Sequence, residues 1–158
     1  NGVPVSAAVG RADLFDVMGY GEASDTWSAN PLASAAVLAT LEEFETTGAL
    51  EHARKLSATL EQGLCRLEET PIVANVRGEG VVWGVECRSV GARSAEEVAR
   101  AAVAACYLGD GQGRAIHLLG PLAGKVLRVS PPIVMPIDDA AEHLDAMHQI
   151  FQSLAASL

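Results

Sequence analysis

The chain has 158 residues, 49% of them hydrophobic, so it is long enough and apolar enough to bury the core of one ordinary domain. Its 20 acidic residues against 11 lysines and arginines give a formal net charge of −9, which argues against binding to the phosphate backbone of nucleic acid. Charged residues interrupt every apolar run before it reaches the roughly 18 residues needed to span a membrane. No signal-peptide pattern opens the chain, so we expect a cytoplasmic protein with no membrane partner.

The N-terminal part of the chain holds short elements. Residues 5–9 are small and apolar enough for a buried strand, and residues 11–17 predict a short helix. Residues 19–24 contain two glycines and predict a loop. This piece is too small to fold by itself.

The strongest helix signal in the chain begins at Asn30-Pro31. Asparagine is a good N-cap, and proline fits the first helical position, where its missing N–H costs nothing. Residues 31–47 are good helix formers, and Gly48 follows as the C-terminal cap. The polar residues at 25–30 precede the positive end of the helix dipole, which suits an anion such as phosphate. A capped helix without a ligand is the alternative interpretation.

A second helix and a hairpin are predicted next. In residues 50–70 leucine and alanine recur at spacings of three and four, which gives the helix one apolar face, and Pro71 ends it. Residues 72–76 and 81–87 are β-rich runs. The two glycines in residues 77–80 between them suit a hairpin turn, so we expect antiparallel pairing.

The rest of the chain predicts two helices and two strands. A capping box at residues 94–97 begins a helix that fades near Leu108. Residues 115–119 and 125–129 predict short strands, and Asp138 caps a last amphipathic helix. This alternation predicts an α+β fold in which helices cover a small antiparallel sheet.

Cysteine and histidine spacing indicates no metal site. Cys65, Cys87 and Cys106 are odd in number, far apart and in apolar surroundings, so we expect buried free thiols in a reducing compartment. His143 and His148 are five residues apart, which turns the two rings away from each other on a helix.

Four segments carry a resemblance to a known family. In chain order they are Asn1-Gly-Val-Pro-Val-Ser-Ala7, Thr26-Trp-Ser-Ala-Asn-Pro31, Asn75-Val-Arg-Gly-Glu-Gly80 and Val126-Leu-Arg-Val-Ser-Pro-Pro132. Together they resemble the C-terminal portion of the class III aminotransferases. These are pyridoxal-phosphate enzymes of fold type I that include the acetylornithine, ornithine and 4-aminobutyrate aminotransferases. The resemblance covers essentially the whole chain.

The resemblance implies a division of the chain and a cofactor. Residues 1–29 would end the large α/β domain and supply an interface loop, and residues 30–158 would form the C-terminal small domain. The cofactor would be pyridoxal 5′-phosphate in a homodimer whose sites are shared between subunits. The Schiff-base lysine of the family would precede Asn1, so the resemblance places no catalytic residue within this chain.

The resemblance also assigns three binding residues. Thr26 matches the threonine that reaches the cofactor phosphate of the other subunit, with the backbone N–H of Trp27 as a helper. Arg128 matches the arginine that binds a substrate carboxylate in several members. The family more often has phenylalanine or tyrosine at the Trp27 position and glycine at the Ala29 position, so the local backbone can differ here.

The residues themselves allow separate tests of these roles. Lys55 on a polar helix face and Lys125 beside Gly124 lack the desolvated pocket that a Schiff-base lysine requires, so we expect ordinary surface residues. Arg128 lies on an otherwise apolar strand, where it must either reach solvent or meet an anion. An ion pair with an acidic residue is its alternative role. We interpret Arg77, in a predicted turn, as structural.

Nothing in the sequence forms a nucleophile-and-base pair, so we interpret Ser130 and His117 as structural. Two functional hypotheses follow. The first is the C-terminal part of a transaminase that moves an amino group between an amino acid or ω-amine and a 2-oxo acid, inactive as this chain alone. The second is a free-standing α+β module for ligand binding or dimerisation, without catalysis.

Overall fold

The chain divides into two units, residues 1–48 and 49–158, in a computed structural model that describes residues 2–121 and 123–158. The first unit contains α1 (Ala12–Phe15) and α2 (Pro31–Thr46). The Asn30 side chain accepts a hydrogen bond from the Ala33 amide at 2.9 Å, which confirms the predicted N-cap. No residue in 2–48 is buried, so the first unit has no core of its own.

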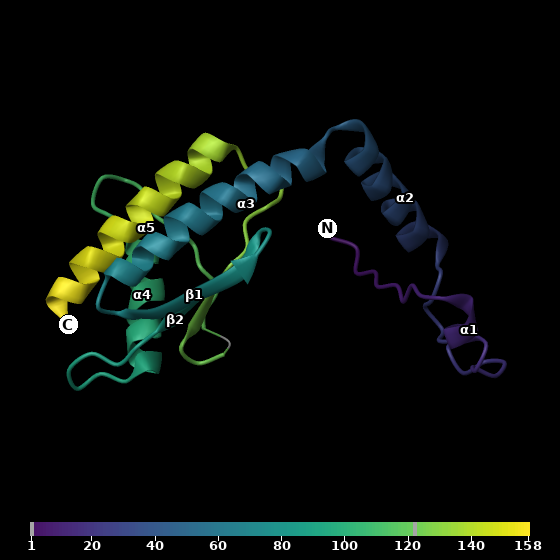
Figure 1. Cartoon of the computed structure of the whole chain (residues 1–158), viewed down its shortest axis with the longest axis horizontal. Coiled ribbons are helices and arrows are strands. Elements are labelled where there is room, and N and C mark those ends of the chain that lie inside the picture. Colours follow the sequence, from purple (N-terminus) through teal and green to yellow (C-terminus); the bar gives the residue numbers. More distant parts are fainter. Residues whose placement is uncertain (1, 122) are drawn as a thin grey trace. The chain divides into compact units, whose positions relative to one another are not determined.

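The second unit is a two-layer α+β structure (Figure 1). Its elements in chain order are α3 (Ala49–Cys65), the 3-10 turn η1 (Arg66–Glu69), β1 (Val73–Glu79), β2 (Val82–Cys87), α4 (Ala95–Leu108), β3 (Val126–Val129) and α5 (Ile137–Ser157). The strands form one antiparallel sheet in the order β1-β2-β3. The predicted α+β fold with a small antiparallel sheet is therefore confirmed.

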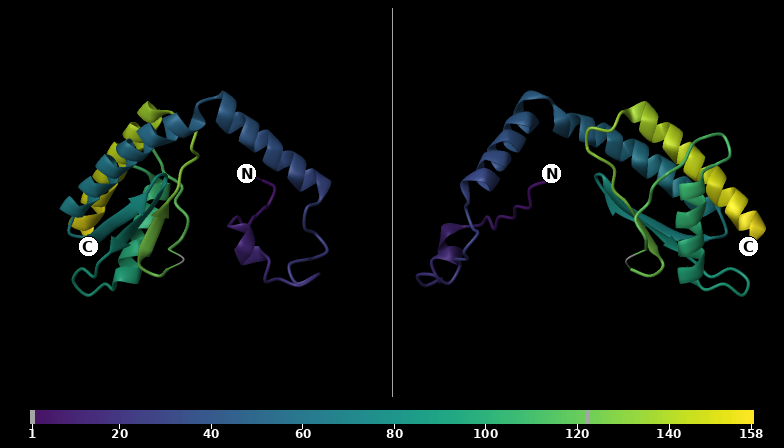
Figure 2. Two further views of the ribbon diagram at one scale, coloured as in Figure 1. Left: turned by 45° about the vertical axis from the view of Figure 1, so that its right-hand side comes forward. Right: turned by 180° about the vertical axis from the view of Figure 1, so that it is seen from behind.

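The three long helices of this unit supply one layer and the sheet supplies the other. The long helices α3 and α5 lie side by side in all three ribbon views (Figures 1 and 2). The strands alternate, so that Trp83, Val85 and Leu127 point into the core with Phe151 of α5. The residues between them on the strands point to the opposite face. In the described part of the chain, no helix of this unit contributes a core to that face.

Local signals set the helix ends. Ser94 accepts a hydrogen bond from the Glu97 amide at 3.2 Å, and the Glu97 carboxylate accepts one from the Ser94 amide at 2.8 Å, which confirms the capping box. The pKa of Glu97 is lowered, chiefly by that bond from the Ser94 backbone. The first long helix ends as predicted, with Gly48 at a φ of +68° directly after its last turn.

Two predicted strands do not form. Residues 5–9 have no strand partner among the described residues, and without a neighbouring strand their backbone cannot form a ladder. Residues 115–119 are also irregular. The amide of Ile116 donates instead to the carbonyl of Cys106 at 2.8 Å, near the end of α4, while Leu118 is still buried in the core. Apolar character alone does not distinguish such a covering segment from a strand.

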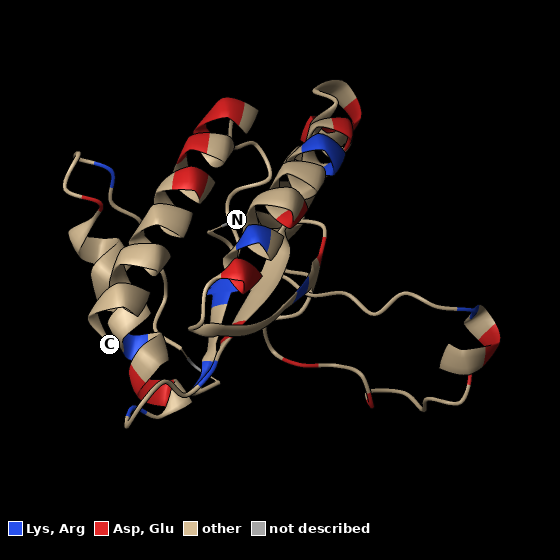
Figure 3. Cartoon of the chain, turned by 60° about the vertical axis from the view of Figure 1, so that its left-hand side comes forward, with Lys and Arg blue, Asp and Glu red and all other residues tan. Residues whose placement is uncertain are grey.

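Three predicted boundaries were wrong. The hairpin turn lies at residues 80–81 and not at 77–80, because Glu79 pairs with Val82 across it and β1 continues through Arg77. The second long helix changes to a 3-10 turn after Cys65. Asp138 lies within the first turn of α5, whose N-cap is Pro136, so its carboxylate interacts with the helix dipole and is not a cap. Figure 3 shows the acidic residues gathered on the first half of this helix.

Helix α2 belongs to the first unit, because the chain divides between Gly48 and Ala49. The domain boundary after residue 29 that the resemblance implied stays a prediction. Helix α2 is apolar around most of its circumference, and Leu32, Leu38 and Leu41 are exposed. A helix that is apolar around its circumference is generally buried against other structure.

Candidate functional site

The loop before α2 is folded around the carboxylate of Asp25. This carboxylate accepts hydrogen bonds from the Trp27 amide at 2.7 Å, the Ser28 amide at 2.8 Å and the Ser28 hydroxyl. The hydrogen bond from the Ser28 hydroxyl, followed by the two amides, holds the pKa of Asp25 below its usual value. Asp25 therefore takes the place that an external anion could occupy on these amides.

Thr26 and Trp27, the predicted phosphate ligands, differ in their availability. The Thr26 side chain is exposed, and its hydroxyl has no hydrogen-bond partner within residues 2–121 and 123–158. The Trp27 amide is bonded to Asp25. The Thr26 hydroxyl therefore fits a phosphate group, whereas the Trp27 amide would have to exchange Asp25 for it. Their roles in cofactor binding stay a prediction.

Backbone geometry explains a sequence difference in this loop. Ala29 has a φ of +53°, the left-handed region that glycine adopts without strain. The glycine that the family more often has here is thus the easier residue for this backbone. A cavity of about 500 Å³ lies beside the loop, and its polar lining includes Ser6, Ser28 and Ser34.

Arg128, the predicted carboxylate ligand, lies on the face of the sheet opposite the core. It is exposed, while its neighbour Leu127 is buried among the core residues. In the part of the chain that the structure describes, no acidic side chain forms an ion pair with Arg128. The alternative role, a structural ion pair within this chain, therefore has no partner among those residues.

The same face carries a linked group of charges. The carboxylate of Glu86 on β2 accepts hydrogen bonds from Arg77 and from Lys125, each at 2.7 Å. Lys125 is the larger cause and Arg77 the next, and together they lower the pKa of Glu86. The pKa of Lys125 is raised, mainly by Glu86. Sequence analysis did not identify Glu86, although strand alternation places it on the face opposite Trp83 and Val85.

A hollow connects the arginines of this face. A cavity of about 360 Å³ is lined by Arg77, Gly84 and Arg128, and by residues of the connection before β3, among them Leu119 and Gly120. Its charged lining residues are both arginines. The arrangement can therefore bind an anion, and the planar guanidinium groups suit a carboxylate.

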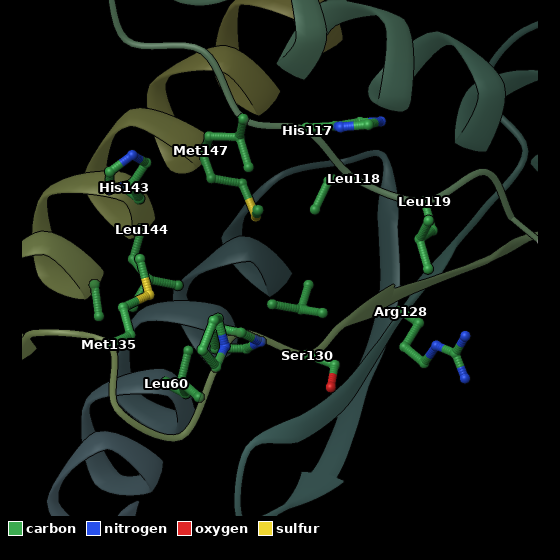
Figure 4. A pocket seen from close by; sticks show the side chains of 15 residues that line it. Leu60, His117, Leu118, Leu119, Arg128, Ser130, Met135, His143, Leu144 and Met147 are labelled. Carbon is green, nitrogen blue, oxygen red and sulfur yellow. The ribbon is translucent and has the colours of Figure 1, made fainter. Parts of the chain in front are cut away.

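A third cavity, of about 310 Å³, lies between the sheet and α5 and is mainly apolar (Figure 4). Met135, Leu144 and Met147 line it. The Arg128 side chain extends away from these three residues, so its charged end belongs to the other face. His117, Ser130 and His143 also line this cavity, and no hydrogen bond joins Ser130 to either histidine among the described residues.

The described lysines and cysteines are not placed for covalent catalysis. Lys55 is exposed and lies 3.9 Å from Glu51, and Lys125 is bonded to Glu86, so neither occupies a closed apolar pocket. Burial raises the pKa of the Cys87 thiol to about 11 and that of Cys106 to about 12, which keeps both protonated. Cys65 is exposed, which corrects the prediction that it is buried.

The described residues form neither a metal site nor a membrane-spanning helix. Within residues 2–121 and 123–158, no group of three or more histidine, cysteine, aspartate or glutamate side chains could hold a metal ion. Over the same ranges, no helix has the length and apolar character needed to cross a membrane.

Comparison with known proteins places the site in context. A family model described as "Aminotransferase class-III" matches residues 1–151. The leucine/methionine racemase of Thermococcus litoralis is 32% identical over 152 residues, 94% of this chain and 33% of that protein. The acetylornithine aminotransferase of Thermosynechococcus vestitus is 32% identical over 157 residues, 98% of this chain and 35% of that protein.

Solved structures share the fold. The ornithine aminotransferase of Toxoplasma gondii matches with a TM-score of 0.74 and 23% identity, over 94% of this chain and 33% of that one. A transaminase obtained by ancestral reconstruction matches with a TM-score of 0.69 and 26% identity, over 93% of this chain and 32% of that one. The chain thus spans about a third of the length of the relatives it matches.

Proposed function

Because this chain belongs to the class III aminotransferase family, we propose that it is the C-terminal part of an enzyme that moves an amino group between an amino acid or ω-amine and a 2-oxo acid. The observation that carries this proposal is Arg128. Its guanidinium is exposed, lines a cavity with another arginine and has no acidic partner in the described chain. A substrate carboxylate would supply the anionic partner that the Arg128 guanidinium lacks.

The proposed cofactor is pyridoxal 5′-phosphate, which supplies an aldehyde for the amino group and a ring that accepts electrons. The Thr26 hydroxyl would donate a hydrogen bond to its phosphate in the neighbouring subunit of a homodimer. We place the lysine that holds the aldehyde outside these 158 residues, since Lys55 and Lys125 are both exposed to water and near carboxylates. A cytoplasmic location is part of the same proposal.

Arg128 would bind and orient the substrate. Strand β3 holds the start of the side chain, since Leu127 on one side is buried in the core and Pro131-Pro132 follow the strand closely. A bidentate contact between guanidinium and carboxylate fixes both position and plane. Lysine offers charge without that planar geometry.

The test uses an enzyme that contains this chain together with the lysine-bearing part. We expect Arg128→Lys to lower kcat/KM for carboxylate substrates by roughly ten- to a hundredfold, because a hydrogen bond to a charged group contributes about 1.5–3 kcal/mol. The melting temperature should hardly change. Arg88→Lys is the control, since Arg88 is exposed and lies outside this cavity. A fall in melting temperature with unchanged kinetics would assign Arg128 a structural role instead.

A second candidate function has one observation in its favour. The hydrophobic core lies within residues 49–158, as expected of a module that folds independently and binds a ligand without catalysis. An assay for amino transfer distinguishes the two. If an amino group is transferred between an amino acid and a 2-oxo acid, the hypothesis of a non-catalytic module is excluded. If no transfer occurs in the enzyme that contains this chain together with the lysine-bearing part, that hypothesis is supported.

A further inference from the structure

Arg77 and Arg128 lie in one row across the sheet. The register pairs Arg77 on β1 with Gly84 on β2, and Gly84 with Arg128 on β3. Residues directly opposite each other in antiparallel strands project to the same face. Neighbouring strands are about 4.8 Å apart, so the two arginine Cα atoms are separated by about 10 Å with only a glycine between them.

Gly84 leaves the space between the arginines open. Its φ is not in the left-handed region, so the backbone there does not require glycine. A Cβ at this position would lie 3.2 Å from Cγ1 of Val126 and 3.7 Å from the Arg77 carbonyl oxygen, which needs only a small movement of one side chain. Packing therefore does not require glycine either. Any larger residue would stand in the hollow that both arginines line.

Glu86 holds Arg77 at the middle strand. Its Oε2 accepts a hydrogen bond from Nη1 of Arg77 at 2.7 Å, so a side chain of β2, the strand between β1 and β3, fixes the guanidinium of this β1 residue. Lys125 bonds to the other oxygen, Oε1. One carboxylate is thus paired with two cations, Arg77 and Lys125, whereas Arg128 on the same face has no acidic partner among the described residues. Four of the five N–H donors of Arg77 are not used in this bond.

We propose that Arg77 is a second carboxylate-binding residue, which contacts the same substrate carboxylate as Arg128 across the gap at Gly84. Glu86 and Lys125 are positioning residues that hold Arg77 in place. This assignment rests on the proposed function, and it replaces the interpretation of Arg77 as a turn residue with a merely structural role. It goes beyond the role of Arg128, because it makes substrate affinity depend on all three strands of the sheet.

Kinetics of the holoenzyme that contains this chain test the assignment. Two amino donors are compared, L-alanine and the carboxylate-free benzylamine. Arg77→Gln should raise KM for L-alanine about tenfold, as expected for the loss of one charged hydrogen bond, and leave kcat/KM for benzylamine within about twofold. Arg77→Lys should raise KM for L-alanine by less than Arg77→Gln does, but KM should still exceed that of the natural enzyme. Gly84→Ala should also raise KM for L-alanine without affecting benzylamine.

The matched control is Arg88→Gln, which removes an exposed arginine that does not line the hollow. Melting temperatures are measured for all variants. Equal losses for both donors in Arg77→Gln, together with a lower melting temperature, would show that the bond to Glu86 is only structural and would overturn the proposal. Unchanged KM for L-alanine would overturn it as well.

A binding measurement separates this inference from the proposed function. The 158-residue chain is labelled with ¹⁵N and titrated with propionate, and the Nε–Hε signals of arginine are followed by NMR. We expect the Arg77 and Arg128 signals to shift together, and both shifts to weaken in Arg77→Gln, whatever the enzyme assay shows. A shift confined to Arg128, or no shift, contradicts the two-arginine site. If the signals of both arginines shift but the enzyme transfers no amino group, the two-arginine carboxylate site is supported and the proposed aminotransferase activity is contradicted.

Discussion

Thr26 and Arg128 present a free hydroxyl and a free guanidinium, respectively, to solvent from two different units of the chain. Within the described ranges neither group has a hydrogen-bond partner in the protein. Water satisfies such groups, so the fold does not depend on them. Substitution of either residue should therefore change ligand binding much more than the free energy of unfolding.

For Thr26 the expected change concerns the cofactor. Thr26→Ala should raise the dissociation constant for pyridoxal phosphate roughly ten- to a hundredfold, because a hydrogen bond to a charged phosphate contributes about 1.5–3 kcal/mol. Equilibrium dialysis of the enzyme that contains this chain measures the constant. Ser24→Ala is the control, since its hydroxyl bonds to the Gly21 carbonyl in the same loop. Unchanged cofactor retention in Thr26→Ala would remove the residue from the site.

Between elements, helices α3 and α5 approach each other closely at Gly63. A Cβ at this position would lie 2.7 Å from Cδ1 and 2.8 Å from Cβ of Leu144, so Leu144 or the helices must move. We expect Gly63→Ala to lower the free energy of unfolding by about 1–3 kcal/mol, the usual cost of overpacking. Urea denaturation measures it. Gly120→Ala, where no atom lies within 4 Å of a Cβ, should change stability little. Equal stability of both variants would contradict the tight helix contact.

The sheet should show a pH-dependent contribution from Glu86. Hydrogen bonds from Lys125 and then Arg77 lower its pKa in the folded protein below the ordinary value of 4.5. A lowered folded pKa stabilises the fold at pH values above the unfolded pKa, and this contribution is lost as the pH falls through the folded pKa. Glu86→Gln should therefore lower the melting temperature at pH 7, and the difference from the natural chain should shrink as the pH falls below 4.5 and through the lowered folded pKa.

The matched variant for this experiment is Glu61→Gln on α3. Glu61 is exposed and forms no ion pair among the residues that the structure describes. Its substitution should leave the melting temperature nearly the same at each pH. A difference between Glu86→Gln and the natural chain that persists undiminished at pH 3 would mean that the ion pairs of Glu86 do not stabilise the sheet.

At the scale of the whole molecule, the two units differ in how much they bury. Residues 49–158 contain the hydrophobic core, whereas no residue in 2–48 is buried and Leu14, Val17 and Trp27 are exposed. A segment without buried apolar contacts opens locally at little cost in free energy.

Limited proteolysis of the 158-residue chain should reveal this difference. We expect trypsin to cleave first after Arg11, and chymotrypsin to cleave first at aromatic residues of 2–48 as far as Phe44, which leaves a chymotryptic fragment beginning near Ala49 that resists digestion. Mass spectrometry identifies the cuts. Arg54 and Lys55, in α3, provide an internal control for tryptic sites inside the stable unit. Simultaneous cleavage in both units would show that residues 49–158 have no separate stability.

By itself, the sequence determined the helices, the hairpin and the family. The N-cap at Asn30 and the capping box at Ser94 are short-range hydrogen-bond patterns, which residues a few positions apart set without help from the rest of the fold. The four motifs led to the family because their order along the chain is itself sequence information. The motif residues Thr26 and Arg128 were chosen in the same way, and their roles stay predictions.

Only the tertiary structure decided which residues share a face and which strands exist. Residues 115–119 are as apolar as a strand, but the segment covers the core without joining the sheet. Whether such a segment becomes a strand depends on whether the edge of another strand lies nearby. Likewise, the row that joins Arg77 to Arg128 depends on the register between strands about 40 residues apart in sequence. Register is set by the packing of distant strands in three dimensions, so no local pattern could place the second arginine beside the first.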